Sequence, residues 1–256
     1  IKSFTSLINT NNILPINESA FVSTNGGAFL YNLENNEITK YIDTFNYKNI
    51  NTISKDQYDR IWIGGSSPNG VIQILNSDFE MKYTIDYANF NQINKIVFSD
   101  NFAFAACFNN DEYGIIKYSN SFENNPSYLN FFDDFPYENF IINDLDIYND
   151  TLYVATDKGL LKADCNNNFL SFSNEWITEY VSENIKDILI DNEDIYMFID
   201  TSVLKNDEVI QIAVDADNIL QTLIFENNLY YLTNEYLYKI DTNNFLSNVF
   251  ELPNIF

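Results

Sequence analysis

Apolar and polar residues alternate along this chain in a unit that is repeated six times. In residues 59–75, DRIWIGGSSPNGVIQIL, an apolar run leads into a turn and a second apolar run leaves it. Five other stretches have the same order, and the central residues of the six units are Phe21, Trp62, Ala103, Tyr153, Tyr196 and Tyr230. Their spacings of 41, 41, 50, 43 and 34 residues are close to the roughly 40–45 residues of one four-stranded propeller blade.

Each unit is flanked by further segments with the pattern of a strand. Segments such as INTIS, INKIV and INDLDI precede the units and are apolar at every second or third position. More variable segments, among them EITKYI, SYLNFF and FLSNVF, follow them. Four short strands per repeat predict an all-β propeller of four-stranded antiparallel blades, because radial packing covers both faces of each sheet. The six predicted blades are approximately residues 10–45, 47–87, 90–132, 137–178, 181–214 and 216–250.

The two ends of the sequence have the pattern of parts of one further blade. IKSFTS is typical of an outer strand, and ELPNIF is typical of the first strand of a blade. We therefore expect a single propeller domain over 1–256, in which 1–6 and 251–256 belong to a closing seventh blade. We also expect the sequence to be a piece of a longer chain. The alternative is a six-bladed ring in which IKSFTS is an extra edge strand.

Glycine and asparagine mark the predicted turns. Asn is abundant and suits turns, because it tolerates left-handed backbone conformations and bonds to its own backbone. The four glycines that stand just before the third strand of a unit are Gly27, Gly70, Gly114 and Gly159. At these four positions we expect either a positive φ or a close approach of another part of the chain.

The charge and the missing residue types exclude several classes of function. The formal net charge is −24, from 37 acidic and 13 basic residues, so the surface repels nucleic acid and anionic lipid. No run of 18 apolar residues is present, and we expect no direct membrane insertion. The absence of His removes Ser-His-Asp and Cys-His nucleophiles and His-ligated metals. Cys107 and Cys165 either pair in an oxidising compartment or are both small buried residues.

Two stretches carry a resemblance to a known family. The pattern of isoleucines, Asp56, IWIG and a later glycine over 50–75 resembles the two-component regulator propeller repeat. Residues 127–176, which include NDTLYVATDKGLLKAD, resemble secreted propeller proteins of the Bacteroidetes, among them the PorZ-like propellers of the type IX secretion system. The resemblance implies a secreted, periplasmic or cell-surface protein of a Gram-negative bacterium. It specifies the architecture well and the chemistry poorly.

Carboxylates are the only plentiful reactive groups, and two of them hold equivalent positions on predicted first strands. These are Asp144 and Asp187, and the matching positions elsewhere are Thr52, Lys95 and Thr222. If first strands line a central channel, these side chains would face it and would bind a ligand there, hold Ca²⁺ through oxygen ligands, or act on a glycan. The alternative is that they are solvated polar residues of a wet channel. No other cofactor is expected.

The remaining candidates are aromatic residues and acidic clusters. Trp62 lies inside an apolar strand and is expected in the core, whereas Trp176 follows the polar segment FSNE and is a surface candidate for stacking on a sugar ring. The acidic clusters at 191–194 and 215–218 lack the spacing, glycine and closing Glu of an EF-hand loop, so we expect turns there. The glycine pairs at 26–27 and 64–65 lack the Lys and helix of a phosphate-binding loop.

We therefore predict a non-catalytic, secreted or cell-surface β-propeller that binds a protein partner or a polysaccharide, in association with type IX secretion. One alternative is the extracytoplasmic sensor domain of a hybrid two-component histidine kinase, in which the same repeats occur. A second alternative is a propeller enzyme that degrades a polysaccharide, for which two carboxylates must meet in one cleft. The fold alone cannot select among them, since propellers carry unrelated functions.

Overall fold

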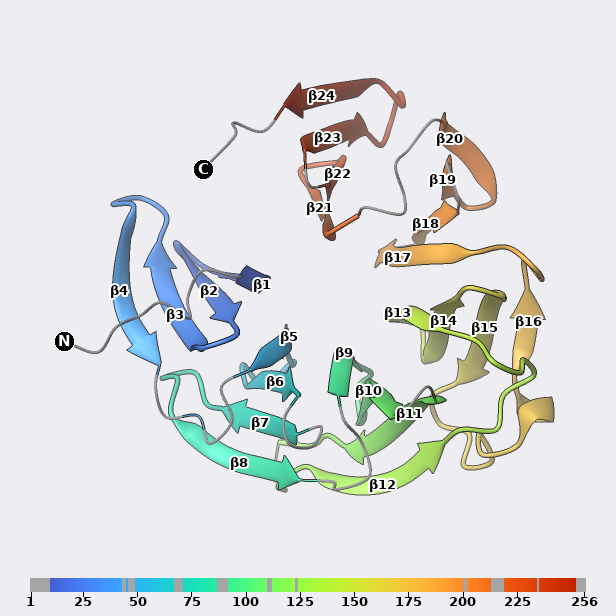
Figure 1. Ribbon diagram of the computed structural model, residues 1–256, viewed down its shortest axis with the longest axis horizontal. Helices are drawn as coiled ribbons and strands as arrows, with labels where there is room; N and C mark the ends of the chain where they lie inside the picture. The colour runs from blue at the N-terminus through green and yellow to red at the C-terminus, as the bar shows by residue number, and fades with distance from the viewer. Residues whose placement is uncertain are drawn as a thin grey trace. The chain divides into compact units, whose positions relative to one another are not determined.

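The computed structural model consists almost entirely of β-strands, which confirms the all-β prediction. It describes residues 10–42, 45, 49–66, 71–86, 92–109, 112–122, 124–199, 202–212, 219–233 and 235–251. Within these residues, 24 strands form six antiparallel sheets of four strands each, as Figure 1 shows. The helix described is a single 3-10 turn, Ser173–Glu175.

The chain forms two compact units, Ile1–Asp133 and Asp134–Phe256, with three sheets in each. Sheet 1 consists of β1 (Thr10–Ile16), β2 (Ser19–Thr24), β3 (Gly27–Asn32) and β4 (Glu37–Ile42). Sheet 2 consists of β5 (Ile50–Lys55), β6 (Ile61–Gly65), β7 (Val71–Leu75) and β8 (Met81–Asp86). Sheet 3 consists of β9 (Gln92–Phe98), β10 (Phe102–Asn109), β11 (Glu112–Ser119) and β12 (Ser127–Phe132).

The second unit repeats this arrangement. Sheet 4 consists of β13 (Ile142–Tyr148), β14 (Thr151–Thr156), β15 (Gly159–Asp164) and β16 (Ile177–Glu179). Sheet 5 consists of β17 (Ile185–Asp191), β18 (Asp194–Ile199), β19 (Ser202–Lys205) and β20 (Glu208–Ile212). Sheet 6 consists of β21 (Gln221–Phe225), β22 (Asn228–Leu232), β23 (Tyr236–Asp241) and β24 (Ser247–Glu251). In every sheet the strands pair in chain order, so each connection is a hairpin.

Asparagine and its neighbours form several of these hairpin turns, as the composition predicts. Both central residues have positive φ in three two-residue turns, which is the geometry of a type I′ turn. These pairs are Asn149 and Asp150 (47° and 56°), Asn206 and Asp207 (47° and 72°), and Glu226 and Asn227 (48° and 58°). Such turns match the twist of the strands they join, so they help to fix the register of the hairpins.

The glycines before the third strands meet the two expected requirements. Gly27 and Gly159 have φ of 127° and 138°, a region that residues with a Cβ rarely adopt. Gly114 instead lies where a Cβ would collide with the ring of Phe131, so it permits a close approach. Gly70 lies outside the described residues.

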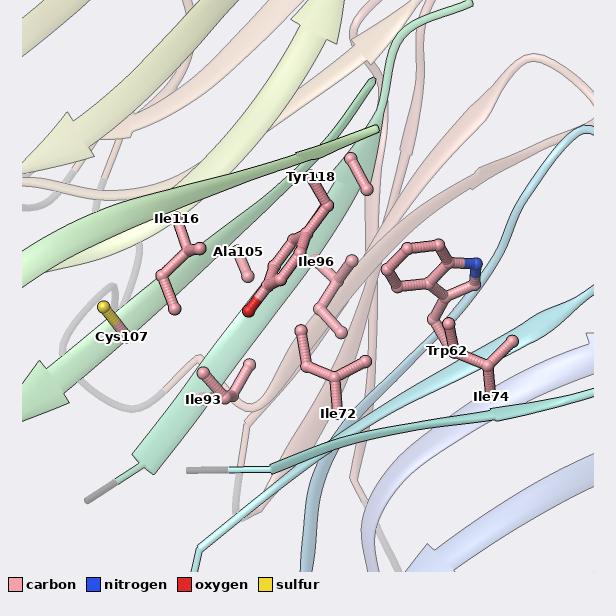
Figure 2. Packing of buried hydrophobic residues seen from close by; sticks show 10 residues of the cluster. Trp62, Ile72, Ile74, Ile93, Ile96, Ala105, Cys107, Ile116 and Tyr118 are labelled. Carbon is pink, nitrogen blue, oxygen red and sulfur yellow. The ribbon is translucent and has the colours of Figure 1, made fainter. Parts of the chain in front are cut away.

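In the first unit, consecutive sheets pack face to face over a core of aliphatic and aromatic side chains. Figure 2 shows Trp62 and Ile72 of sheet 2 facing Ile96 and Tyr118 of sheet 3. Trp62 is fully buried, with the ring of Phe98 at 5.4 Å in an edge-on orientation. A second cluster joins sheets 1 and 2 and includes Phe21, Leu30, Ile53 and Ile63. Because each sheet shields its neighbour, strands that are apolar on both faces are stable here.

The second unit is built in the same way. One cluster joins sheets 4 and 5 through Tyr153, Ala155, Leu160, Ile185, Ile188, Met197 and Ile199. Another joins sheets 5 and 6 through Tyr196, Phe198, Val203, Ile210, Leu229, Tyr231 and Ile240. Five of the six predicted central positions are therefore confirmed as buried core, and Tyr230 on β22 is half-buried.

Some predictions fall on residues that the structure does not describe. Residues 1–6 and 252–256 lie outside the described range, so the closing blade and the single closed domain stay predictions. Cys107 and Cys165 are not in a disulfide and are both fully buried, which agrees with the interpretation as small core residues. Burial raises the pKa of the Cys107 thiol, and this thiol donates to the carbonyl of Gly114 at 3.2 Å.

Candidate functional site

Polar side chains on the first strands bind the next sheet along the chain. A repeated Asn, near the start of the strand, donates from Nδ2 to a backbone carbonyl of the following first strand. The three bonds are Asn11 to Ile50 (2.6 Å), Asn51 to Ile93 (3.4 Å) and Asn143 to Ile185 (2.7 Å). Farther along, Ser54 Oγ donates to the carbonyl of Ile96 at 2.7 Å. These bonds fix the stagger between neighbouring sheets.

The predicted acidic pair takes part in the same inter-sheet bonding. Asp144 is 6% exposed, and its Oδ2 accepts from the backbone N–H of Ile188 on sheet 5 at 3.4 Å. Asp187 Oδ1 accepts from the hydroxyl of Thr222 on sheet 6 at 3.0 Å. Each carboxylate therefore bonds to the sheet that follows its own. The structure brings neither into a described cavity, so a shared cleft stays a prediction.

The other predicted site residues are placed apart from one another. Lys95 is half-buried on β9, opposite Ala106 in the strand register. Trp176 is 5% exposed, so the expectation of an exposed stacking platform is not met. Its Nε1 donates to the carbonyl of Leu170 at 3.0 Å, and its ring lies 5.0 Å from that of Phe135. The polar segment FSNE before Trp176 suggested exposure, but the chain from Leu170 onward folds back over the Trp176 ring.

The acidic clusters do not form a metal site within the described residues. Residues 191–194 form the turn between β17 and β18, as expected, and Asp194 pairs with Lys205 at 2.8 Å. The cluster at 215–218, also predicted as a turn, lies outside the described residues. No group of three or more Cys, Asp or Glu that would hold a metal ion is found in the part of the chain that the structure describes. No helix in that part is long and apolar enough to span a membrane.

A buried ion pair in sheet 2 is the most densely bonded polar group in the first unit. The Asp56 carboxylate is fully buried and accepts from Arg60 Nε at 2.7 Å and from Trp62 Nε1 at 2.9 Å. It also accepts from the backbone N–H groups of Tyr58 and Arg60, both at 2.9 Å. Every bond is internal to the turn between β5 and β6, so this carboxylate holds the turn closed.

Arg60 carries that network on to sheet 3. Its guanidinium donates to the carbonyl of Ser121 at 3.1 Å and to the side-chain oxygen of Asn120, which is fully buried. Since all of these donors and acceptors are paired with one another, the arrangement is a structural link between sheets.

A cavity of about 470 Å³ lies between sheets 4 and 5, and we call it the 4/5 pocket. Its lining residues are Leu160, Lys162, Glu179, Tyr180, Ile195, Met197, Asn206 and Asp207. They come from β15, β16 and the residue after it, β18, and the turn that follows β19. Its volume lies in the range of small-molecule binding sites, and its lining combines three aliphatic residues with five polar ones.

The 4/5 pocket lies at the edge of the packed core between sheets 4 and 5. Leu160 and Met197 belong both to the core cluster and to the pocket wall. Beyond them, β16 has only three residues and β19 only four. Because these short strands supply few side chains to the gap between the sheets, the outer end of the interface stays open.

Two charged contacts define the mouth of the pocket. Lys162 forms an ion pair with Glu179 across β15 and β16. The hydroxyl of Tyr180 donates a short hydrogen bond to Asp207 Oδ1. Burial, followed by the bond to Asp207 and the negative charges of Asp207 and Glu179, raises the pKa of the Tyr180 phenol. The phenol therefore stays protonated and acts as a donor at neutral pH.

The backbone also holds Tyr180 in place. Its φ is 50°, an unusual value for a bulky residue, and its carbonyl oxygen lies against Gly159. A Cβ at Gly159 would stand 2.9 Å from that oxygen and 2.7 Å from the hydroxyl of Tyr137. Glycine is thus required at 159 for the chain to bring Tyr180 to the pocket.

Lys162 occupies a position that recurs in the later sheets. In sheets 3 to 6, a Lys on the third strand lies opposite an aromatic residue on the second strand, with its ammonium over the ring. The pairs are Lys117 with Phe104 (5.7 Å), Lys162 with Tyr153 (5.3 Å), Lys205 with Tyr196 (5.6 Å) and Lys239 with Tyr230 (5.7 Å). The ring limits the ammonium to one side of the sheet, and in sheet 4 that side faces the pocket.

Comparison with known proteins reveals similarity in fold. No protein-family profile matches the chain, and no curated protein matches it. Among solved structures, PorZ of Porphyromonas gingivalis, a bacterial surface component of the type IX secretion system, is 15% identical, with a TM-score of 0.66 over 97% of this chain. The fold is a β-propeller of four-stranded blades. The six sheets are its blades, as the sequence predicts.

Two further structures have the same fold in different settings. The extracellular domain of BT4673 of B. thetaiotaomicron, a one-component system by its description, is 16% identical, with a TM-score of 0.63 over 88% of this chain. The WD40 domain of Pan2 from Neurospora crassa is 11% identical, with a TM-score of 0.68 over 96% of this chain. This chain spans 34% of the PorZ chain, 32% of the BT4673 chain and 80% of the Pan2 chain. At these identities the similarity shows the fold alone.

Proposed function

We propose that this chain is a non-catalytic, secreted or cell-surface propeller that binds a macromolecular ligand, a protein or a polysaccharide. The observation that carries the proposal is the 4/5 pocket, which combines an aliphatic wall of Leu160, Ile195 and Met197 with charged groups at its mouth. The volume of this pocket lies in the range of ligand pockets in proteins.

The contrast between this pocket and the predicted acidic pair favours binding over catalysis. An enzyme that cleaves glycosidic bonds needs two carboxyl groups in one cleft, on either side of the substrate bond. Asp144 and Asp187 each accept a hydrogen bond from the next sheet, which is a structural role. Glu179 and Asp207 line the pocket but are bonded to Lys162 and Tyr180, and the pKa of Tyr180 is raised, which suits a donor and not a base.

The location of the protein is part of the proposal. PorZ is a bacterial surface component of a secretion system, and the BT4673 domain is extracellular, so both support a place outside the cytoplasm of a Gram-negative bacterium. Association with type IX secretion follows from the likeness to PorZ. A sensor domain of a hybrid two-component system is the second candidate, and the likeness to a second structure of BT4673, described as such a system, favours it.

The test of this proposal is whether the chain binds a ligand without cleaving it. The purified chain is titrated by biolayer interferometry against a panel of bacterial surface polysaccharides and against a peptide library. The same polysaccharides are assayed for new reducing ends after long incubation. We expect saturable binding to at least one ligand and no new reducing ends. Release of reducing ends that is abolished by Asp144→Asn or Asp187→Asn would instead establish the polysaccharide-degrading enzyme.

A further inference from the structure

The 4/5 pocket carries an unbalanced negative charge. Its ionisable carboxylates are Glu179 and Asp207, and its only cation is Lys162, which pairs with Glu179. Asp207 accepts from the neutral phenol of Tyr180, and no Lys or Arg among the described residues pairs with it. Asp207 is exposed at the open side of the pocket, and its second carboxylate oxygen has room for further donors.

The wall behind these carboxylates is aliphatic. Leu160, Ile195 and Met197 form it, and Leu160 is 1% and Met197 2% exposed. An apolar wall that ends in carboxylates is the complement of a Lys or Arg side chain, whose methylene stem packs on apolar surface and whose charged head bonds to carboxylates. The net charge of −24 would also attract a basic partner over a distance.

The surface beside the pocket fits an extended polypeptide. β16 is the edge strand of sheet 4, so one side of its backbone is available to a further strand. Ile177 lies two residues before Glu179, on the same face of β16, and its side chain is 62% exposed. Val181, just beyond the pocket, is 60% exposed. A peptide that adds to this edge would place one side chain in the pocket and the next on the same face against Ile177.

We propose that the 4/5 pocket receives a Lys or Arg side chain of a polypeptide partner that adds to the edge of β16. The cation bonds to Asp207 and Glu179, and the stem lies on Leu160, Ile195 and Met197. This inference rests on the proposed binding function and names the partner as a polypeptide. A saccharide is the alternative occupant. Tyr180 is the aromatic residue of the lining, and because its ring is half-buried and its hydroxyl is bonded to Asp207, it offers a smaller stacking face than an exposed ring.

The experiment uses fluorescein-labelled extended peptides with Lys, Arg or norleucine at one central position and apolar residues two positions away. Binding to the purified chain is measured by fluorescence anisotropy. We expect Lys and Arg peptides to bind, and norleucine at that position to weaken binding about fivefold, the upper range for an ion pair with solvent-exposed carboxylates.

A matched pair of variants separates the pocket from general electrostatic attraction. Asp207→Asn and Glu193→Gln each remove one negative charge from an exposed hairpin turn of the same unit, but only Asp207 lines the pocket. Asn tolerates the left-handed backbone at 207, so the first variant should fold, which thermal unfolding checks. We expect Asp207→Asn to lose about fivefold in affinity for the Lys peptide and Glu193→Gln to lose less than about twofold.

The outcomes distinguish this inference from the proposed function. Equal affinities of Lys and norleucine peptides, or equal losses in the two variants, would overturn the basic-side-chain inference while leaving a binding module. Binding of a neutral oligosaccharide that Asp207→Asn abolishes would overturn it in favour of a saccharide site. If no peptide binds but a polysaccharide binds elsewhere, the inference fails and the proposed function stands. If neither peptide nor polysaccharide binds, both fail.

Discussion

Replacing Asp56 by Ala should destabilise the first unit strongly, because this buried carboxylate accepts four hydrogen bonds. Two come from the backbone N–H groups of Tyr58 and Arg60, and two come from Arg60 Nε and Trp62 Nε1. In the variant, the Trp62 N–H loses its acceptor in a fully buried position. The Arg60 side chain, 13% exposed, keeps its bonds to Asn120 and Ser121 but loses its counter-charge.

The size of the effect follows from the burial of these groups. Removing one partner of a buried ion pair costs about 3–5 kcal/mol, since the other charge is left uncompensated. For a chain of this size, 1 kcal/mol corresponds to about 2–4 °C in Tm, so we expect Asp56→Ala to lower Tm by about 6–20 °C. The matched control is Asp59→Asn, which removes an exposed ion pair with Lys55. Such pairs contribute about 0–1 kcal/mol.

Tryptophan fluorescence can follow the unit that contains the change. Trp62 lies in the first unit and Trp176 in the second, so a Trp176→Phe background leaves only the reporter in the first unit. Both Asp variants are compared in that background by thermal unfolding, with far-UV circular dichroism as a second probe. If Asp56→Ala lowered Tm no more than Asp59→Asn, the hydrogen-bonded ion pair would contribute nothing, and the structural role assigned to it would be wrong.

Three further predictions concern backbone, inter-sheet and pH effects. Gly159→Ala should cost about 1–3 kcal/mol more than Gly27→Ala in thermal unfolding, because both have positive φ but only the Cβ at 159 meets atoms at 2.7–2.9 Å; equal losses would contradict this. Asn143→Ala should cost about 1 kcal/mol in the same assay, since the carbonyl of Ile185 loses its 2.7 Å donor; no loss would show that water replaces the bond. Burial raises the pKa of the Tyr231 phenol, so the folded state keeps its proton where the unfolded state loses it. The contribution of Tyr231 to the free energy of unfolding is therefore complete below about pH 10 and falls above it, by up to about 1.4 kcal/mol per pH unit. In Tyr231→Phe, the free energy of unfolding measured with denaturant should fall less steeply above about pH 10, by up to this slope.

The fold could be predicted because its cause is local and repeated. Phe21, Trp62 and Ala103 are each at the centre of an apolar strand, and each is fully buried in the structure. A strand that is apolar on both faces must be covered on both, and a repeat of about 40 residues leaves few architectures that can do so. The positive φ of Gly27 and the close approach at Gly114 could likewise be predicted, because a glycine just before a strand has few physical explanations.

The candidate site could not be predicted because it depends on how neighbouring sheets meet. The spacing of Asp144 and Asp187 correctly gave equivalent positions, but only the stagger of the sheets reveals that each bonds to the sheet after its own. The inter-sheet Asn had a visible signal, an Asn after the first apolar residue of INTIS and INDLDI, which the apolar pattern overshadowed. Lys162, Tyr180 and Asp207 meet in the 4/5 pocket from separate strands and turns, and nothing in their sequence spacing indicates this meeting.

Polar residues on the first strands and polar residues at the 4/5 pocket have different roles. This difference explains how the fold can persist at low sequence identity while the function does not follow from the fold. Polar groups on the first strands, such as Asn143 and Asp144, are consumed in bonds to the next sheet, so they fix the stagger of the sheets and have little capacity left for a ligand. The pocket residues Glu179 and Asp207 are instead bonded to Lys162 and Tyr180, not to a first strand. The 4/5 pocket opens where β16 and β19 end early, and its lining residues outside the core cluster, such as Glu179 and Asp207, can change without disturbing the bonds between first strands. Substitutions there should alter ligand preference at little cost in stability, whereas substitutions on first strands should do the reverse.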